Sequence, residues 1–396
     1  MTTTSITQVL PRVLFVKRHA AMGVLGDSFV ASTKFEVLKA FESPLPLPEF
    51  LADQSHPVSA IIAPVAVPVT ADLIRLLPNL RLVVTTSTGV DHVDLVECRR
   101  RGISVANAGS SYSEDVADTA VGLLIDVFRR ISAANRFVKQ RLWPLKGDYP
   151  LGSKLGRKRI GIVGLGSIGS MVATRLEAFG CQISYSSRNR KPSFPYHYYV
   201  DVHEMAANSD ALVICCELND KTLHLINRDV FAALGKQGVI VNVARGGIID
   251  EGEMVRCLRE GEIGGAGLDV FEDEPNVPKE LFELDNVVLS PHCAYTSLEG
   301  LEQLGKQGVI VNVARGGIID EGEMVRCLRE GEIGGAGLDV FEDEPNVPKE
   351  LFELDNVVLS PHCAYTSLEG LEQLGKVLVG NIEAFFSNKP LLTPVL

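Results

Sequence analysis

The sequence predicts an α/β protein with two domains, each built on a parallel sheet that helices cover. Short apolar runs rich in valine and isoleucine alternate with amphipathic stretches of helical period, which is the pattern of such sheets. The chain has 396 residues, 46% of them apolar and 22% charged, and is therefore long enough to bury two cores. A Gly-x-Gly-x-x-Gly motif that begins at Gly164 marks the second domain as Rossmann-like.

The first domain, flavodoxin-like in its pattern, is expected over residues 1–108. Thr70 is a suitable cap for a helix over TADLIRLLPNL, because its side chain can accept a hydrogen bond from the first turn. A long helix from about Ser113 to Arg141 follows, and it is expected to end near Trp143. Four apolar runs are the expected strands: VLFV at 13–16, AIIA at 60–63, LVVT at 82–85 and ISVAN at 103–107.

The second domain is expected over residues 109–295 and has the stronger series of strands. Residues 366–389 then have the pattern of one long helix. The expected strands of the second domain are RIGIVG from 159, ISYSS from 183, ALVICC from 211, VIVNVA from 239, GAGLDVF from 265 and NVVLSPH from 286.

One segment of this domain is repeated without a substitution. Residues 234–303 (copy one) and 304–373 (copy two) are the same 70 residues, and Leu374–Lys376 begins a third copy that stops at once. Structural arrays usually repeat at roughly 20–50 residues and have atypical end repeats. The identity therefore indicates a recent duplication or an error in gene assembly, with a genuine doubled element as the alternative. Without one copy, 326 residues remain, and residues 304–373 are interpreted as surplus.

Composition excludes several classes of protein. The formal net charge is −12, but one copy has 14 acidic and 5 basic residues, so the chain without it has a charge of −3. We see no basic stripe for nucleic acid, no apolar run of about 18 residues for a membrane and no secretory leader. The eight cysteines lack zinc-like spacing, so no metal site is expected. The cysteines are expected to be free thiols, and the protein is expected to be cytoplasmic.

The glycine motif predicts a dinucleotide site. Gly164 permits a tight turn, Gly166 lets the backbone approach a pyrophosphate, and Gly169 lets helix and strand pack closely. The helix that starts with Ser167 and Ile168 presents unpaired N–H groups to the phosphates.

The segment after the next strand suggests which dinucleotide binds. About 20 residues beyond the motif, where an NAD site places a carboxylate, the sequence has Ser186 and Ser187 followed by Arg188 and Arg190. Hydroxyl and guanidinium groups suit a 2′-phosphate, whereas a carboxylate would repel it. NADPH is therefore predicted in preference to NADH, with a merely solvated basic loop as the alternative.

Three polar residues follow three strands of the second domain. Arg245 follows VIVNVA, Glu274 follows GAGLDVF after a short acidic turn, and His292 ends NVVLSPH. Ligands of open parallel sheets bind outside the carboxyl ends of the strands, so all three are expected to face one crevice. Each has an ordinary structural explanation when taken singly. Together they would bring a cation, an anion and a titratable imidazole to the same crevice.

These motifs resemble the D-isomer-specific 2-hydroxyacid dehydrogenase family, and above all plant NADPH-dependent hydroxypyruvate/glyoxylate reductases. The resemblance extends from about Val58 to the C-terminus, less one repeat. It comprises STGVDHVDL from Ser87, EDVADTAVGLL from Glu114, GLGSIG from Gly164, NVARGGIIDE from Asn242, GAGLDVFEDEP from Gly265 and NVVLSPH from Asn286.

The resemblance implies a reductase of a small 2-oxo acid with its active site in the interdomain cleft. It assigns catalysis to Arg245, Glu274 and His292, and the chemistry explains the set. Arg245 can hold the substrate carboxylate and polarise the carbonyl, and His292 can donate a proton to the ketone oxygen. Glu274 can hold the imidazole oriented and charged, which would raise the histidine pKa.

The resemblance also implies further contacts and an assembly. Backbone N–H groups of a glycine-containing loop, here Thr88 and Gly89, would bind the substrate carboxylate. Asp269 would contact the cofactor, and Trp143, the only tryptophan, matches a position that can reach a partner subunit's site. A homodimer is expected. The tail, residues 366–396, is expected to cross back and complete the first domain.

The repeat duplicates the catalytic set as Arg315, Glu344 and His362. Copy one has the expected helix before its first strand, whereas copy two leads into the tail helix. We expect copy one to complete the sheet and copy two to be extruded or poorly packed.

Two rival interpretations remain open. One is a dinucleotide-binding or sensing protein of the same fold without turnover. The other is an enzyme like formate dehydrogenase, although relatives of that kind pair the histidine with glutamine, and position 274 is a glutamate.

Overall fold

The computed structural model describes residues 10–17, 34–54, 58–64, 67–295, 308–364, 366–387, 389–390 and 392–393. The chain divides into two compact units, one of residues 1–115 with 295–303 and one of residues 116–294 with 304–396. This division differs from the predicted one, because the tail belongs to the second unit.

The first unit contains a parallel five-stranded sheet in the order β2-β1-β3-β4-β5. Thr70 caps α3 as predicted, since its hydroxyl oxygen accepts a hydrogen bond from the N–H of Leu73. The short strand β2 was missed, because EVLK lacks a run of apolar residues. The elements are β1 (Arg12–Phe15), β2 (Glu36–Lys39), α2 (Leu47–Gln54), β3 (Val58–Ala63), α3 (Ala71–Arg75), β4 (Leu82–Thr85), α4 (Leu95–Arg101) and β5 (Ser104–Ala106).

The second unit contains a parallel seven-stranded sheet in the order β12-β11-β10-β9-β6-β7-β8. The strand order reverses next to β6, where the crevice of a doubly wound sheet forms. Copy one supplies β10, β11 and β12, so it completes this sheet as expected. The strands are β6 (Arg159–Val163), β7 (Gln182–Ser186), β8 (His197–Tyr199), β9 (Ala211–Ile214), β10 (Val239–Asn242), β11 (Gly265–Leu268) and β12 (Val287–Leu289).

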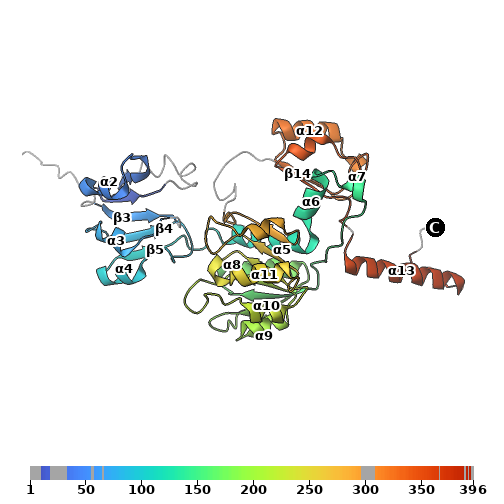
Figure 1. Ribbon diagram of the computed structural model, residues 1–396, viewed down its shortest axis with the longest axis horizontal. Coiled ribbons are helices and arrows are strands. Elements are labelled where there is room, and N and C mark those ends of the chain that lie inside the picture. The colour runs from blue at the N-terminus through green and yellow to red at the C-terminus, as the bar shows by residue number, and fades with distance from the viewer. Residues whose placement is uncertain are drawn as a thin grey trace, which may run out of the picture. The chain divides into compact units, whose positions relative to one another are not determined.

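Helices cover the faces of this sheet (Figure 1). Leu123 and Val127 of the helix α5 lie against Gly265 and Gly267 of β11, where a side chain on either glycine would collide with them. The helices are α5 (Ser113–Arg129), α8 (Ser167–Ala178), α9 (Val202–Ala207), α10 (Arg228–Leu234) and α11 (Glu251–Arg259).

The prediction of one helix from Ser113 to Arg141 was wrong. The helix breaks at Arg130, which adopts a left-handed conformation with φ of 57°, and continues as α6 (Ile131–Lys139) and α7 (Trp143–Lys146). The carboxylate of Asp126 accepts hydrogen bonds from both the backbone N–H and the hydroxyl of Ser132. This side chain replaces the helical carbonyl partner of that N–H, which explains the break.

Copy two forms a separate three-stranded sheet, β13-β14-β15, with the strand register of copy one. Its elements are β13 (Val309–Asn312), α12 (Glu321–Glu330), β14 (Gly335–Leu338) and β15 (Val357–Leu359). A small core joins these elements to Val138 of α6 and to Trp143. Copy two is therefore folded outside the main sheet and is not simply extruded.

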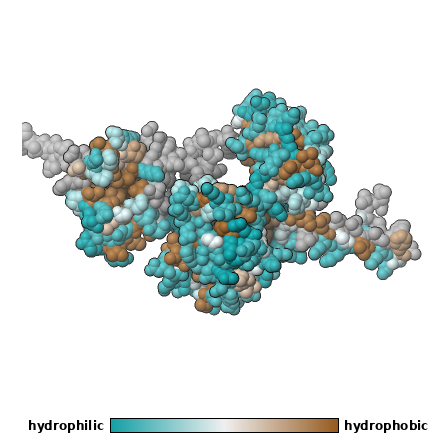
Figure 2. Space-filling model, viewed as in Figure 1, coloured by the Kyte–Doolittle hydropathy of each residue, from teal (hydrophilic) through white to brown (hydrophobic). Residues whose placement is uncertain are grey.

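The outer edge of β13 differs from its counterpart in copy one. β10 pairs with β9, whereas β13 pairs only with β14 among the described residues. Val309, Val311 and Val313 alternate along the chain and so share one face of the sheet. They are 66%, 70% and 64% exposed, although the identical residues of copy one are buried. Figure 2 shows hydrophobic surface in the region that Figure 1 labels β14 and α7. An unpaired apolar edge of this kind invites association with other chains.

Deletion of residues 304–373 is expected to raise the soluble yield and to suppress aggregation on heating, because it removes this edge. Deletion of copy one gives the same 326-residue sequence, so no choice between the copies is needed. Light scattering during a thermal ramp measures the effect. Equal or greater scattering by the shortened chain would show that β13 is not the aggregating element.

The tail forms the predicted long helix, α13 (Leu368–Phe386). Its Glu369 accepts hydrogen bonds from the hydroxyl of Ser153 and the N–H of Lys154, and pairs with Lys158 at 3.3 Å. These partners belong to the second unit, whereas the tail was predicted to complete the first domain. The reason is that the tail follows copy two, which lies outside the main sheet. No helix in the described part of the chain is long and apolar enough to cross a bilayer.

Candidate functional site

The glycine motif forms a tight turn between β6 and α8. Gly164 has φ of +98°, and a side chain there would lie 2.7 Å from the backbone of Cys216. A side chain on Gly169 would lie 2.1 Å from the carbonyl oxygen of Gly164. At Gly166, in contrast, an added Cβ meets no atom within 4 Å. Gly164 and Gly169 are thus required by packing, and the open space at Gly166 suits close approach of a bound pyrophosphate.

The different surroundings of Gly166 and Gly169 allow NADPH binding and protein stability to be tested separately. Gly169→Ala is expected to lower the melting temperature, because overpacking of a close contact typically costs about 1–3 kcal/mol. Gly166→Ala is expected to leave the melting temperature unchanged and to weaken NADPH binding about tenfold or more, since its methyl group would project into the ligand space. Calorimetric unfolding and fluorescence titration measure the two effects. Unchanged NADPH affinity in Gly166→Ala would remove this glycine from the site.

The residues predicted to select the dinucleotide lie where β7 ends. The carbonyl oxygen of Ser186 accepts a hydrogen bond of 2.7 Å from the N–H of Gly164, which ties the end of β7 to the turn. Ser187, Arg188 and Arg190 follow, and both arginines are exposed. Arg188 lies 3.5 Å from Glu217, a residue after β9 that no sequence motif indicates. Both side chains are 81% exposed, so this ion pair holds Arg188 weakly.

Arg245 stands at the carboxyl end of β10. The buried Asn242 shapes the turn, because its amide nitrogen donates to the carbonyl of Arg245 and its amide oxygen accepts from the N–H of Ala244. A side chain on Gly246 would lie 1.9 Å from the backbone of Phe271, so glycine allows this turn to touch the segment that leads to Glu274. Close backbone contact therefore links the arginine to the glutamate.

Glu274 and His292 form a pair at the ends of β11 and β12. Nδ1 of His292 lies 2.7 Å from Oε2 of Glu274, and Oε1 of Glu274 accepts a hydrogen bond from the N–H of Phe271. Burial raises the pKa of Glu274, but the hydrogen bonds from His292 and Phe271 outweigh it and hold that pKa below its ordinary value. The carboxylate is therefore ionised at neutral pH beside the imidazole.

The buried Asp269 holds the turn that carries the histidine. Its carboxylate accepts hydrogen bonds from the hydroxyl of Ser290 and the N–H groups of Cys293 and Ala294. Its carbonyl accepts one from the N–H of His292, which has φ of 53°. Asp269 was predicted only as a cofactor contact, and the structure shows that it also positions His292.

Copy two reproduces this local geometry. His362 lies 2.7 Å from Glu344, the N–H of Phe341 donates to Glu344, and Arg315 has the backbone angles of Arg245. What differs is the neighbouring strand. β10 lies in one sheet with β9 and β6, and so with the glycine turn, whereas β13 does not. Only the set of copy one therefore shares a sheet with the dinucleotide motif.

A second histidine–glutamate pair supports the acidic turn of copy one. Nε2 of His224 lies 2.8 Å from Oε1 of Glu272, and the N–H of His224 donates to the carbonyl of Gly247. His224 thus links the turns that carry Arg245 and Glu274. No sequence pattern indicates this pair, because His224 lies outside the repeat and far from Glu272 in sequence.

Thr88 and Gly89 belong to the first unit, where they follow β4. The hydroxyl of Thr88 donates to the carbonyl of Gly109, and the carbonyl of Thr88 accepts from the side chain of Asn107. The hydroxyl of Ser87 donates to the carbonyl of Gly89. These bonds hold the loop and do not involve the N–H groups of Thr88 and Gly89.

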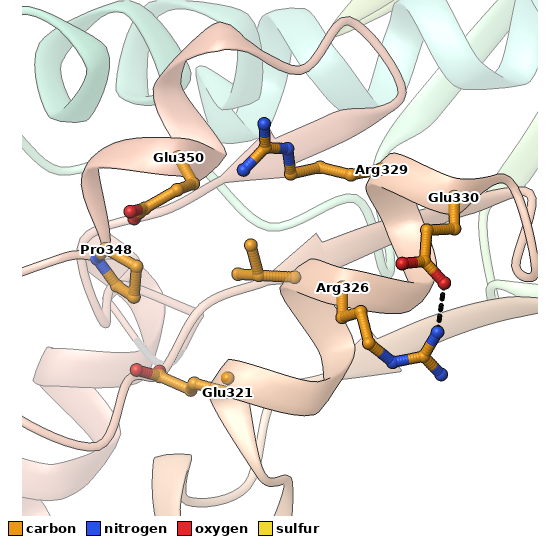
Figure 3. A pocket seen from close by; sticks show the side chains of 8 residues that line it. Glu321, Arg326, Arg329, Glu330, Pro348 and Glu350 are labelled. Atoms are coloured by element: carbon orange, nitrogen blue, oxygen red, sulfur yellow. Dashed lines mark hydrogen bonds and ion pairs between the residues drawn. The ribbon is translucent and has the colours of Figure 1, made fainter.

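A surface cavity of about 590 Å³ lies elsewhere, in copy two (Figure 3). None of Arg315, Glu344 and His362 lines it. Its Arg326 already pairs with Glu323, Glu330 and Glu332. We therefore assign no function to this cavity. Its lining consists of Glu321, Gly322, Val325, Arg326, Arg329, Glu330, Pro348 and Glu350.

A doubly wound sheet with a Gly-x-Gly-x-x-Gly turn defines a dinucleotide-binding protein. The chain belongs to the D-isomer specific 2-hydroxyacid dehydrogenase family, whose NAD binding domain matches residues 121–294 and again residues 296–364. This confirms the predicted family, the class of enzyme and the fold class of two Rossmann-like domains.

Relatives of known activity cover most of the chain. It is 56% identical to a glyoxylate/hydroxypyruvate reductase of Arabidopsis thaliana over 260 residues, which is 66% of this chain and 80% of the relative. It is 47% identical to a hydroxyphenylpyruvate reductase of Plectranthus scutellarioides, over 63% of this chain and 80% of the relative. Among solved structures, the chain is similar to an NADPH-dependent glyoxylate/hydroxypyruvate reductase of Sinorhizobium meliloti in complex with NADP and malonate. The TM-score is 0.67 and the sequence identity is 35%. The match covers 74% of this chain and 89% of that one.

Proposed function

We propose that the protein reduces small 2-oxo acids with NADPH, converting hydroxypyruvate to D-glycerate and glyoxylate to glycolate. The observation that carries this proposal is the 2.7 Å contact between His292 and an ionised Glu274, at the carboxyl end of the sheet that contains the glycine turn. When bound at the glycine turn, NADPH would supply the hydride for this reduction.

The catalytic residues of copy one, and the residues that hold their turns, have distinct roles in this reaction. His292 donates a proton to the carbonyl oxygen as negative charge develops there, and Glu274 keeps the imidazole oriented. Arg245 holds the substrate carboxylate and polarises the adjacent carbonyl. His224, Glu272 and Asp269 act as positioning residues through the turns they hold.

Two further parts of the site are proposed from the resemblance. The N–H groups of Thr88 and Gly89 bind the substrate carboxylate, and Asp269 lies close to the cofactor in addition to its structural role. Gly164, Gly166, Ser167, Ile168 and Gly169 bind the pyrophosphate.

We propose that copy two does not turn over substrate, because no glycine turn shares its sheet. It has the same local set of residues in Arg315, Glu344 and His362.

The loss of absorbance at 340 nm with NADPH and hydroxypyruvate tests the function. We expect turnover with NADPH and a higher KM with NADH. Arg188→Ala with Arg190→Ala is expected to raise the KM for NADPH about tenfold, because hydrogen bonds to a charged phosphate contribute roughly 1.5–3 kcal/mol. The KM for NADH is the internal control and stays unchanged. NADPH binding without oxidation would instead support a binding protein, and equal KM changes for both cofactors would contradict the 2′-phosphate assignment.

We also propose a cytoplasmic homodimer. Its location is supported by eight cysteines that are all free, as expected in a reducing compartment. Imaging of a fluorescent fusion tests the location.

A further inference from the structure

The segment proposed to select the dinucleotide is fixed by hydrogen bonds of its own. We call residues 187–191, which carry both arginines of the proposed phosphate site, the selectivity loop. The hydroxyl of Ser187 donates to the carbonyl of Asn189 at 2.7 Å, which closes the turn. The hydroxyl of Tyr198, on the neighbouring strand β8, donates to the carbonyl of Ser187 at 3.1 Å. The first half of the loop is thus tied to the sheet.

A second tyrosine holds the other end of the selectivity loop. The hydroxyl oxygen of Tyr185, on β7, accepts a hydrogen bond of 2.8 Å from the N–H of Lys191. Tyr185 is 1% exposed, and its ring centre lies 5.3 Å from that of Tyr198. Because both ends of the loop are tied to strands, the backbone at Arg188 is held in place, and only the side chain has a choice of partner.

The connection after β9 presents a carboxylate to this loop. Its first residues lie against the glycine turn, because a side chain on Gly164 would lie 2.7 Å from the backbone of Cys216. The carbonyl of Glu217 accepts a hydrogen bond of 2.6 Å from the hydroxyl of Thr222, which folds the connection back on itself. Glu217 is therefore held at its backbone, whereas its side chain is exposed.

Arg188 and Glu217 meet across the end of β6. They follow β7 and β9, which are the neighbours of β6 on its two sides. Nη2 of Arg188 lies 3.5 Å from Oε2 of Glu217. Each side chain is 81% exposed, so the pair can separate at little cost in free energy. A 2′-phosphate that binds Arg188 must displace this carboxylate or lie beside a group of the same charge.

We infer that Glu217 limits the preference of the protein for NADPH over NADH, because its carboxylate competes with the 2′-phosphate for Arg188. NADPH has to break the ion pair and brings a phosphate with a charge of about −2 toward the carboxylate. NADH has a hydroxyl in place of this phosphate and leaves the pair intact. The inference rests on the proposed 2′-phosphate site and adds to it a residue from a different strand end.

Equilibrium binding without substrate tests this inference. Glu217→Gln keeps the size of the side chain and removes its charge. The dissociation constant of NADPH is expected to fall about two- to fivefold at low ionic strength, which is the range that exposed ion pairs contribute. The dissociation constant of NADH is expected to stay unchanged. An unchanged affinity for NADPH, or an equal gain for NADH, would overturn the inference.

Asp220 supplies a matched control in the same connection. It is an exposed carboxylate close to Glu217 in sequence, but Glu217 is the residue that pairs with Arg188. Asp220→Asn removes the same charge and is expected to leave both dissociation constants unchanged. If Asp220→Asn strengthens NADPH binding as much as Glu217→Gln does, the net charge of this surface is responsible and competition for Arg188 is refuted.

A double-mutant cycle shows whether Glu217 acts through Arg188. Arg188→Ala is expected to weaken NADPH binding, and Glu217→Gln is expected to have no further effect in that background, since the contested guanidinium is gone. The same gain from Glu217→Gln with and without Arg188 would contradict the competition. If Arg188→Ala leaves the NADPH affinity unchanged, the proposed 2′-phosphate site fails together with this inference. A loss in Arg188→Ala without a gain in Glu217→Gln overturns this inference alone.

Discussion

His292→Gln is expected to lower kcat on the order of 10²–10⁴-fold, which is the usual contribution of a positioned proton donor. Glutamine keeps a polar side chain of similar size but cannot deliver a proton to the carbonyl oxygen. The φ of 53° at His292 and the hydrogen bond from its N–H to Asp269 belong to the backbone, so the turn itself is retained. Single-turnover kinetics with NADPH and hydroxypyruvate measures the loss in the chemical step.

His362→Gln in the same chain is the matched control. His362 has the same sequence neighbours, the same 2.7 Å contact with a glutamate and a similar backbone conformation, with φ of 50°. We expect kcat to stay within about twofold of the unmodified chain, because copy two shares no sheet with the glycine turn. A large loss of kcat in His362→Gln, with kcat of His292→Gln near normal, would show that copy two forms the active site.

Arg245→Gln is expected to lower kcat/KM about 10²–10³-fold, with much of the loss in KM. The guanidinium supplies a full positive charge and a fork of donors that matches a carboxylate, and the neutral amide replaces neither. Because Asn242 shapes this turn through the backbone of residues 244 and 245, the substitution leaves the turn intact. Steady-state kinetics over a range of hydroxypyruvate concentrations measures the change.

Arg315→Gln provides the corresponding control and is expected to have no effect on kcat/KM. NADPH affinity is a second control, since Arg245 is assigned to the substrate and not to the dinucleotide. If Arg245→Gln weakened NADPH binding as strongly as it raised the KM for hydroxypyruvate, the arginine would belong to the cofactor site instead.

The local geometry of the catalytic set could be predicted from the sequence, and the repeat demonstrates why. Copy two lacks the neighbours β9 and β6, yet its Glu344 and His362 meet at the same distance as Glu274 and His292. Asp339 also holds its turn through Ser360 and Cys363, as Asp269 does in copy one. The pair therefore forms without β9 and β6, through hydrogen bonds within one 70-residue unit.

Features that depend on particular side-chain hydrogen bonds were predicted less well. The break at Arg130 was missed, because helical period alone does not reveal that Asp126 binds Ser132. The pairing of His224 with Glu272 joins the connection after β9 to the connection after β11. No spacing rule along the chain indicates such a contact.

The glycine turn, the alternation of strands with helices and the residue types of the site follow from local sequence patterns, because they depend on turns and periodicities among near neighbours. The strand order was not predicted, since it depends on distant pairings such as that of β6 with β9. Two identical segments, however, are indistinguishable to any rule that considers residues alone. Which of them pairs with β9, and which packs against α6, depends on where each enters the sheet. Copy one follows α10 directly and therefore has the shorter loop to close when it joins the sheet. Copy two buries its apolar residues against Val138 of α6 and Trp143 instead.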